Sequence, residues 1–367
     1  MKLQYNIDHY LNKIDGQHRA FKERLLYSIE LLQKAQKLAT LYDPENGYYL
    51  AFSGGKDSQA LYHVAELAGV PFMAHMNLTS VDPPEVIRFV KRNYPEVELI
   101  KPKDSIYNIA VKKGMLPTQR IRWCCEEFKE NAGAGKVTLI GIRKAESVRR
   151  SKRNEVEVSS KAFSGNLESF EEFREERMKN SKVKKIKLPK PSVANLDDVN
   201  QEQITGCITG KESILISPII HWSENDVWYF LNELLQVPHC SLYDSGMTRI
   251  GCIGCPMSNH KQKIKEMELY PHVKRNWLNA IRRIRRGDNK ANVYQTITEW
   301  GGRDYLPTEH ISKETAGFLG APSENEGVNI EDVETQVCEN IYDWWISGKS
   351  YKEWYADKFL QQEIEFE

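Results

Sequence analysis

The most constraining feature of this 367-residue sequence is a six-residue loop, SGGKDS at positions 53–58, that joins an apolar run to a helical segment. Residues Tyr48 to Phe52 have the pattern of a short buried strand, and Ser58 to Leu67 have the pattern of a helix. Two adjacent glycines let the backbone approach a phosphate with no Cβ in the way. The N-terminus of the following helix offers N–H groups and the positive end of a dipole. The loop therefore predicts a phosphate-binding turn.

The polar residues of this loop have separate expected roles. Lys56 supplies a positive charge, Asp57 is expected to hold Mg²⁺ or to cap the helix, and both are candidate catalytic residues. Both serines can donate hydrogen bonds to phosphate oxygens. The candidate phosphate ligands are Ser53, Gly54, Gly55, Lys56, Asp57 and Ser58.

Strands and helices alternate after the loop. Further strands are expected at Pro71–Leu78, Val97–Ile100, Val137–Ile142 and Ile214–Ile220, and helices at Pro84–Arg92, Ile106–Lys113 and around Cys124–Glu130. This alternation predicts an α/β fold, with a parallel sheet covered by helices on both faces. Sheets of this kind bind ligands at the carboxyl ends of their strands.

Three regions are expected along the chain. Residues 1–47 form an N-terminal helical segment, residues 48–258 form the α/β domain, and residues 259–367 form a mostly helical C-terminal region. Within the α/β domain, residues from about 150 to 195 are rich in charge and are expected to form a mobile polar insertion.

A second polar segment follows the strand expected at Val137–Ile142. Gly141 frees the backbone at the strand end, and Arg143 and Arg149 suit bidentate contact with phosphate or sulfate. Glu146 is expected to orient one of these two arginines, and Arg143 is a candidate catalytic residue. The alternative interpretation is a run of solvated surface charge.

These two segments resemble a known family. The loop resembles the signature of the PP-loop superfamily, the N-type ATP pyrophosphatases or adenine nucleotide alpha hydrolase-like proteins, which cleave ATP between the α and β phosphates. The segment from Gly141 to Arg150 resembles an element of the phosphoadenosine phosphosulfate (PAPS) reductase-like branch, and the likeness covers about residues 48–258. It implies a Rossmann-like fold and an adenine nucleotide held by the loop and by Gly141, Arg143, Glu146 and Arg149.

Five of the seven cysteines are candidate metal ligands, namely Cys124, Cys125, Cys240, Cys252 and Cys255. A Cys-x2-Cys turn containing glycine, as at residues 252–255, suits zinc or an iron–sulfur cluster. The N-terminus shows no apolar signal segment, so the protein is expected to be cytoplasmic, where thiols stay reduced. Cys207 and Cys338 stand apart and are expected to be small buried residues.

The resemblance implies two alternative ligand sets for a [4Fe–4S] cluster, with zinc as the less favoured occupant. Iron–sulfur adenylylsulfate reductases imply the set Cys124, Cys125, Cys252 and Cys255. The DNA phosphorothioation sulfurtransferases imply the set Cys124, Cys240, Cys252 and Cys255. Both sets stay open at the level of the sequence.

The resemblance also implies two alternative reactions. Assimilatory reductases carry a Glu-Cys-Gly-x-His tail and tend to have a degraded phosphate loop, whereas this chain ends without a cysteine and keeps the loop intact. We therefore expect an adenylating ATP pyrophosphatase or sulfurtransferase, in which sulfur displaces AMP, rather than a thioredoxin-dependent reductase of PAPS or adenylylsulfate. The third hypothesis is a nucleotide-binding regulator without catalytic activity.

Charge and hydropathy limit the partners. Lys plus Arg equals Asp plus Glu at 51 each, so general polyanion binding is not expected, and no apolar run is long enough for a membrane helix. Basic segments at Arg149–Arg153, Lys182–Lys187 and Arg282–Arg286 would fit a nucleic-acid acceptor, although solvated surface charge is the favoured explanation. The sequence does not specify the sulfur donor or thiol reductant.

Overall fold

The computed structural model describes residues 7–130, 133–159, 164–165, 213–286, 330–350, 353–354 and 356–357. Its contacts divide the chain into two compact units. The first unit comprises Met1–Leu78, Pro84–Lys101 and Lys129–Gly251, and the second comprises Thr79–Pro83, Pro102–Phe128 and Cys252–Glu367.

The first unit contains a sheet with seven strands in its described residues, in the order β3-β2-β1-β4-β7-β5-β6. The strands are β1 (Tyr48–Ala51), β2 (Phe72–Asn77), β3 (Glu98–Ile100), β4 (Val137–Leu139), β5 (Val156–Ser159), β6 (Ser164–Gly165) and β7 (Ser213–Ile216). The five neighbouring strands β3, β2, β1, β4 and β7 pair in parallel, which confirms the predicted α/β fold.

One expectation about the sheet is wrong. Residues from about 150 were expected to leave the core as a polar insertion, but β5 pairs antiparallel with β7, and β6 pairs antiparallel with β5. The pairing of Val156 with Ile216 begins this ladder, and Val156 packs against the apolar core. The remaining parts of the expected insertion, residues 160–163 and 166–195, lie outside the described residues.

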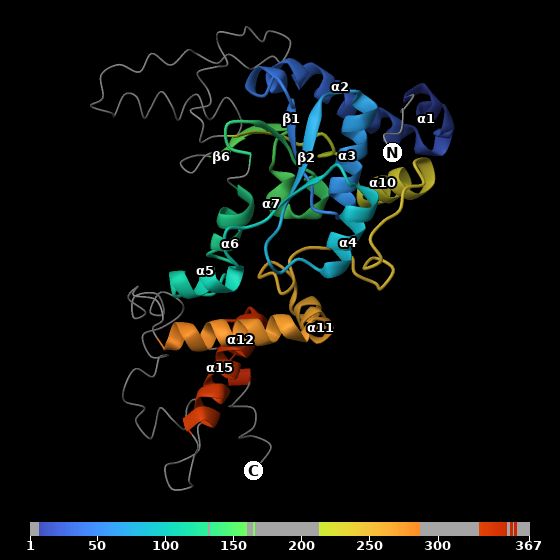
Figure 1. Cartoon of the computed structure of the whole chain (residues 1–367). Coiled ribbons are helices and arrows are strands. Elements are labelled where there is room, and N and C mark those ends of the chain that lie inside the picture. The colour runs from blue at the N-terminus through green and yellow to red at the C-terminus, as the bar shows by residue number, and fades with distance from the viewer. Residues whose placement is uncertain are drawn as a thin grey trace, which may run out of the picture. The chain divides into compact units, whose positions relative to one another are not determined.

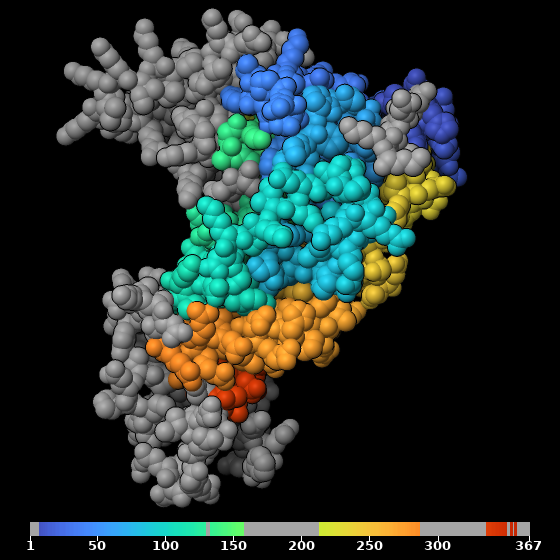
Figure 2. Space-filling view, in the orientation of Figure 1, coloured from blue at the N-terminus to red at the C-terminus, as the bar shows by residue number. Residues whose placement is uncertain are grey.

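Helices of the first unit surround the strands in Figure 1. They are α1 (Ile7–Lys13), η1 (Gly16–His18), α2 (Arg19–Tyr42), α3 (Lys56–Ala68), α4 (Pro84–Asn93), η3 (Lys144–Glu146), α7 (Val148–Ser151), α10 (Glu224–Trp228) and the π-helical η5 (Tyr229–Leu234). In the space-filling view, side chains from α2 to α4 form one continuous surface (Figure 2). The predicted N-terminal helical segment is thus present as α1, η1 and α2.

The two faces of this sheet differ in chemistry. Leu50, Met76 and Leu139 lie in the apolar core with residues of α2, α3 and α4. The alternate positions of these strands point to the other face, which carries the polar side chains of Tyr49, His75 and Thr138. Tyr49 is opposite Thr138 on the neighbouring strand, and His75 is opposite Ala51. Tyr49, His75 and Thr138 are nevertheless buried, so this polar face is part of the interior.

The second unit is helical in its described residues. Its elements are α5 (Ile106–Lys113), α6 (Trp123–Cys125), the π-helical η2 (Glu126–Glu130, of which Glu126–Phe128 fall in this unit), α11 (His260–Leu269), α12 (Pro271–Arg285) and α15 (Ile330–Ser347). Its core contains Trp277, Trp345 and Cys338, which is 1% exposed. None of the helices in the described parts of either unit has the length and apolarity needed to cross a membrane.

Candidate nucleotide site and cysteine cluster

The turn between β1 and α3 depends on Gly54. Its φ of 71° lies in the left-handed region, where residues with a Cβ are strained. A Cβ at this position would also lie 2.7 Å from Val86 Cγ1 and 2.9 Å from Val90 Cγ2, on α4. Gly55 then caps α3 in an extended conformation. The sequence therefore forms a tight strand–turn–helix connection here, as predicted.

The two serines of the loop hold its shape. Ser58 Oγ accepts from Ser53 N at 3.1 Å and donates to the carbonyl oxygen of Gly55 at 2.8 Å. Ser53 Oγ also lies 3.1 Å from Ser58 Oγ. The hydroxyls are thus engaged within the loop, so their expected contacts with phosphate stay a prediction.

Lys56 is the most enclosed charge of the loop, with 4% of its surface exposed. Its Nζ donates to the carbonyl oxygen of Thr248 at 3.1 Å and lies 3.6 Å from Glu224 Oε1. Its backbone N–H, in the first turn of α3, donates to the hydroxyl oxygen of Tyr243 at 2.8 Å. The phenol therefore already occupies one donor at the end of the helix that was expected to bind phosphate.

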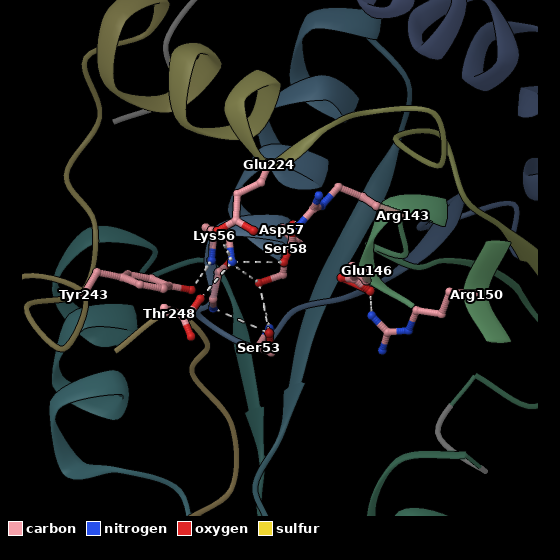
Figure 3. A network of polar contacts seen from close by, with 11 residues as sticks. Ser53, Lys56, Asp57, Ser58, Arg143, Glu146, Arg150, Glu224, Tyr243 and Thr248 are labelled. Atoms are coloured by element: carbon pink, nitrogen blue, oxygen red, sulfur yellow. Dashed lines mark hydrogen bonds and ion pairs between the residues drawn. The ribbon is translucent and has the colours of Figure 1, made fainter. Parts of the chain in front are cut away.

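Arg143 forms the other half of this polar network (Figure 3). It is 3% exposed, and its Nε donates to Asp57 Oδ1 at 2.6 Å. The Nη2 atom of Arg143 lies 4.0 Å from Glu224 Oε2. Asp57 Oδ2 also lies 3.8 Å from Lys56 Nζ, so two buried cations share two carboxylates. The structure thus brings the three candidate catalytic residues, Lys56, Asp57 and Arg143, together, while their role in catalysis stays a prediction.

Gly141 makes this convergence sterically feasible. A Cβ at Gly141 would lie 2.9 Å from the carbonyl oxygen of Asp57 and 3.3 Å from the backbone nitrogen of Ser58. The segment after β4 therefore approaches the first turn of α3 at backbone distance, and only glycine avoids contact there.

Arg149 and Glu146 differ from their expected arrangement. Arg149 is exposed, whereas Arg150 is half-buried and forms an ion pair with Glu146. Burial lowers the pKa of Arg150, and Arg249, Arg153 and Arg143 lower it further by repulsion while Asp57 raises it. A group of arginines therefore lies around Arg150, one residue beyond the predicted position.

Four residues of the network were not predicted: Arg150, Glu224, Tyr243 and Thr248. Glu224 follows Ser223, which caps α10 through a capping box with Asp226. The box signalled the helix start, but only the three-dimensional fold shows that Glu224 reaches Lys56 and Arg143. Thr248 contributes a backbone carbonyl, for which side-chain chemistry gives no signal.

The second unit contains four of the five candidate metal ligands: Cys124, Cys125, Cys252 and Cys255. A hydrogen bond with Cys125 raises the pKa of Cys124, followed by burial and by the charges of Cys125, Cys252 and Cys255. The adjacent pair and the Cys-x2-Cys turn thus belong to the same unit, where Cys124 and Cys252 both pack against the apolar core. Among the described residues, no three His, Cys, Asp or Glu side chains are already arranged for metal coordination.

Contacts within the second unit hold the Cys-x2-Cys turn. Gly254, at φ 68°, donates its N–H to Glu266 Oε2 at 2.7 Å. Ile253 N donates to the carbonyl oxygen of Val81 at 2.8 Å. Thr79 Oγ1 lies 3.4 Å from Cys252 Sγ. The turn is thus fixed on both sides, and four soft thiol ligands fit the donor set that zinc or an iron–sulfur cluster needs.

Cys240, the fifth candidate ligand, belongs to the first unit. It is 0% exposed within the apolar core of the first unit, and burial raises its pKa. Burial in an apolar core is typical of an inert structural thiol. Cys338 is buried in the second unit, while Cys207 lies outside the described residues.

Comparison with known proteins adds a family to this geometry. The model of the phosphoadenosine phosphosulfate reductase domain matches residues 47–258. Two uncharacterized proteins of Methanocaldococcus jannaschii, MJ0973 and MJ0066, are each 25% identical to this chain, over 68% and 64% of it. These alignments cover 51% and 41% of the two relatives, so the chain spans about half their length or less. An adenosine 5'-phosphosulfate reductase of Oceanobacillus iheyensis is 41% identical over 44 residues, or 12% of this chain and 18% of that protein.

Solved structures give more distant similarities. FMN adenylyltransferase of Candida glabrata, in complex with FMN and an ATP analog, is 13% identical with a TM-score of 0.39, covering 67% of this chain and 69% of that chain. PAPS reductase of Candida auris is 17% identical with a TM-score of 0.36, covering 65% and 96%. The matched family model, by contrast, spans more than half of the chain and includes the phosphate loop, Arg143 and the Cys-x2-Cys turn. The protein therefore belongs to the phosphoadenosine phosphosulfate reductase domain family.

Proposed function

We propose that this protein binds Mg-ATP on residues 53–58 and cleaves the bond between the α and β phosphates, producing an adenylated acceptor and pyrophosphate. The observation that carries the proposal is the convergence of buried Lys56 and buried Arg143 beside the N-terminus of α3. Preorganised cations of this kind stabilise the negative charge that develops in phosphoryl and nucleotidyl transfer. The backbone of the glycine turn would hold the phosphates.

The acidic partners of these cations suggest how the site accepts the nucleotide. Asp57 and Glu224 balance Lys56 and Arg143 in the absence of a ligand. An incoming polyphosphate would take over the two cations, which leaves Asp57 available to hold Mg²⁺. Glu224 is the more exposed carboxylate, with 55% of its side chain exposed against 23% for Asp57, and can turn toward solvent.

The arginines around Arg150 support a phosphate-rich acceptor. Arg143, Arg153 and Arg249 all act on Arg150 electrostatically within the first unit. Nucleic acid is therefore the first acceptor class to test. The other basic segment of the described residues, Arg282–Arg286, has a simpler explanation, because α12 packs against α15, which has five acidic and no basic residues.

For the cysteines, we favour Cys124, Cys125, Cys252 and Cys255 as ligands of a [4Fe–4S] cluster. Their mutual effect on Cys124 supports this set over the one containing Cys240, which is buried in the core of the first unit. When bound, such a cluster would supply the electron or sulfur chemistry of the reaction. The sulfur donor is left open.

A second candidate is reduction of adenylylsulfate or PAPS by a thiol reductant. The short segment similar to the Oceanobacillus iheyensis reductase and the cysteine set common to iron–sulfur reductases favour it. The intact loop, with its glycine turn and enclosed Lys56, favours ATP cleavage instead. A regulator that only binds nucleotide is the third candidate, and it leaves the enclosed cations without a catalytic purpose.

The test is an assay of pyrophosphate and AMP release from Mg-ATP by anaerobically purified protein. Lys56→Ala should abolish release, because it removes a buried cation at the phosphate site. Lys91→Ala, at an exposed position on α4, is the matched control and should keep wild-type activity. Turnover of adenylylsulfate with a thiol, in place of pyrophosphate release, would favour the reductase. Nucleotide binding with neither activity would favour the regulator.

A further inference from the structure

A buried lysine in the second unit has no role in the proposed nucleotide chemistry. Lys263, on α11, is 2% exposed, although lysine is among the residue types least often fully buried without a partner. Its Nζ lies close to the backbone, because a Cβ built on Gly348 would be 3.3 Å from it. Enclosing an ammonium in protein is destabilising unless an opposite charge offsets the lost hydration.

The charges around Lys263 are few among the described residues. Burial lowers the pKa of Lys263, while the charge of Cys255 and then that of Glu266 raise it in part. Both carboxylate oxygens of Glu266 are already engaged by neutral donors, since Oε2 accepts from Gly254 N and Oε1 accepts from Gln262 Nε2 at 2.8 Å. Lys263 and Glu266 are three positions apart on α11, so both side chains lie on the face of the helix that contacts the Cys-x2-Cys turn through Gly254. Lys263 is therefore enclosed beside this turn, with Cys255 as the group whose charge most opposes the effect of its burial.

Four thiolates around zinc, or around an oxidised [4Fe–4S] cluster, carry a net negative charge. Such a centre would offset the cost of enclosing Lys263, and the ammonium would in turn stabilise the centre. We infer that Lys263 is the built-in countercharge of a metal centre bound by Cys124, Cys125, Cys252 and Cys255. The inference rests on the thiolate-bound centre proposed above, and it assigns Lys263 a positioning and tuning role rather than a ligand role.

The same α11 helix would act on the centre in two ways. Glu266 fixes the backbone of the Cys-x2-Cys turn through Gly254. Lys263, three residues before Glu266 on the same face of the helix, supplies a positive charge that acts on Cys255. Because net charge near an iron–sulfur cluster sets its reduction potential, removing the ammonium should make the cluster harder to reduce.

The test compares Lys263→Gln and Lys263→Met with Lys261→Gln, which removes the same charge from an exposed position on the same helix. All proteins are prepared anaerobically at full length, and folding is checked by circular dichroism. Two quantities are measured: the midpoint potential of the bound cluster, and the rate at which a chelator removes the thiol-bound metal. The second measurement applies to iron and to zinc alike.

We expect both Lys263 variants to shift the midpoint potential to more negative values and to lose metal several-fold faster than wild type. Lys261→Gln should match wild type in both measurements. Metal retention and potential unchanged in folded Lys263 variants would overturn the inference while leaving the metal centre intact. A wild-type protein that holds no thiol-bound metal would overturn the centre and the inference together, without affecting the proposed ATP cleavage.

Discussion

Arg143 Nε donates to Asp57 Oδ1 at 2.6 Å, which links the segment after β4 to the first turn of α3. The guanidinium is 3% exposed, so this ion pair is enclosed on the arginine side while Asp57 stays accessible at 23%. Breaking a pair of this kind from one side leaves the other charge poorly compensated. The pair therefore couples the shape of the phosphate loop to the arginine that would stabilise the reaction.

Replacing Arg143 tests this coupling. Arg143→Ala should reduce pyrophosphate release by about 100-fold or more, as expected for removal of a preorganised charge stabiliser. The matched control is Arg149→Ala, which removes the same charge from an exposed neighbour and should have little effect. Steady-state kinetics on both variants make the comparison. Equal losses in both would indicate that the two arginines act through general surface charge.

Tyr243 should compete with phosphate for the N-terminus of α3. Its hydroxyl accepts from Lys56 N at 2.8 Å, and the ring also lies beneath Lys56 Nζ, 5.6 Å from its centroid. Tyr243→Phe frees this N–H, so calorimetry should show tighter ATP binding and a loss of stability of about 1 kcal/mol in the protein without nucleotide. Weaker binding in the variant would instead mean that the hydroxyl contacts the nucleotide.

Alanine variants of Gly54 and Gly69 distinguish the cost of backbone strain from the cost of a steric clash. Both have positive φ, 71° and 67°, but only a Cβ on Gly54 would meet other atoms, on Val86 and Val90. Gly69→Ala should therefore cost about 1 kcal/mol, from the left-handed conformation alone. Gly54→Ala should cost clearly more and impair nucleotide binding. Urea denaturation of both variants measures the difference, and equal costs would contradict the packing seen around the loop.

His75 should make stability depend on pH. Burial lowers its pKa below the ordinary 6.5, and Glu98, 3.2 Å away, opposes the shift only in part. The imidazole of the unfolded chain therefore takes up a proton at a higher pH than that of the folded protein. The free energy of unfolding is highest above pH 6.5, and it falls as the pH drops from 6.5 through the lowered pKa of the folded state.

Chemical denaturation at about pH 5.5 and about pH 7.5 brackets this transition. His75→Gln should flatten the difference in unfolding free energy between the two conditions, whereas the exposed His9→Gln should leave it as in wild type. An unchanged pH dependence in His75→Gln would assign the effect to other groups.

Local patterns predicted the parts of the fold whose contacts are close in sequence. The strand at Tyr48–Ala51, the glycine turn and the helix from Lys56 follow one another directly. The helix expected at Ile106–Lys113 has those bounds because Ser105 caps its start and Gly114 ends it in a left-handed conformation.

Features that depend on distant contacts were not predictable in this way. Val156–Ser159 has the charged Glu157 in its middle, and only pairing with β7 makes it a strand. Glu224 joins the phosphate network from another helix. The sequence pointed to Arg149, but the structure pairs Glu146 with Arg150, the next residue. The short helix α7, capped by Ser147, sets which of the two arginines lies on the side of Glu146.

The most direct test of the central claim is which phosphate bond of ATP breaks. Phosphorus NMR of the products formed from Mg-ATP, in wild type and in Lys56→Ala, identifies the bond without assuming an acceptor. The account predicts pyrophosphate together with AMP or an adenylated product in wild type, and neither in Lys56→Ala. Formation of ADP and orthophosphate, or pyrophosphate release that survives Lys56→Ala, would contradict it.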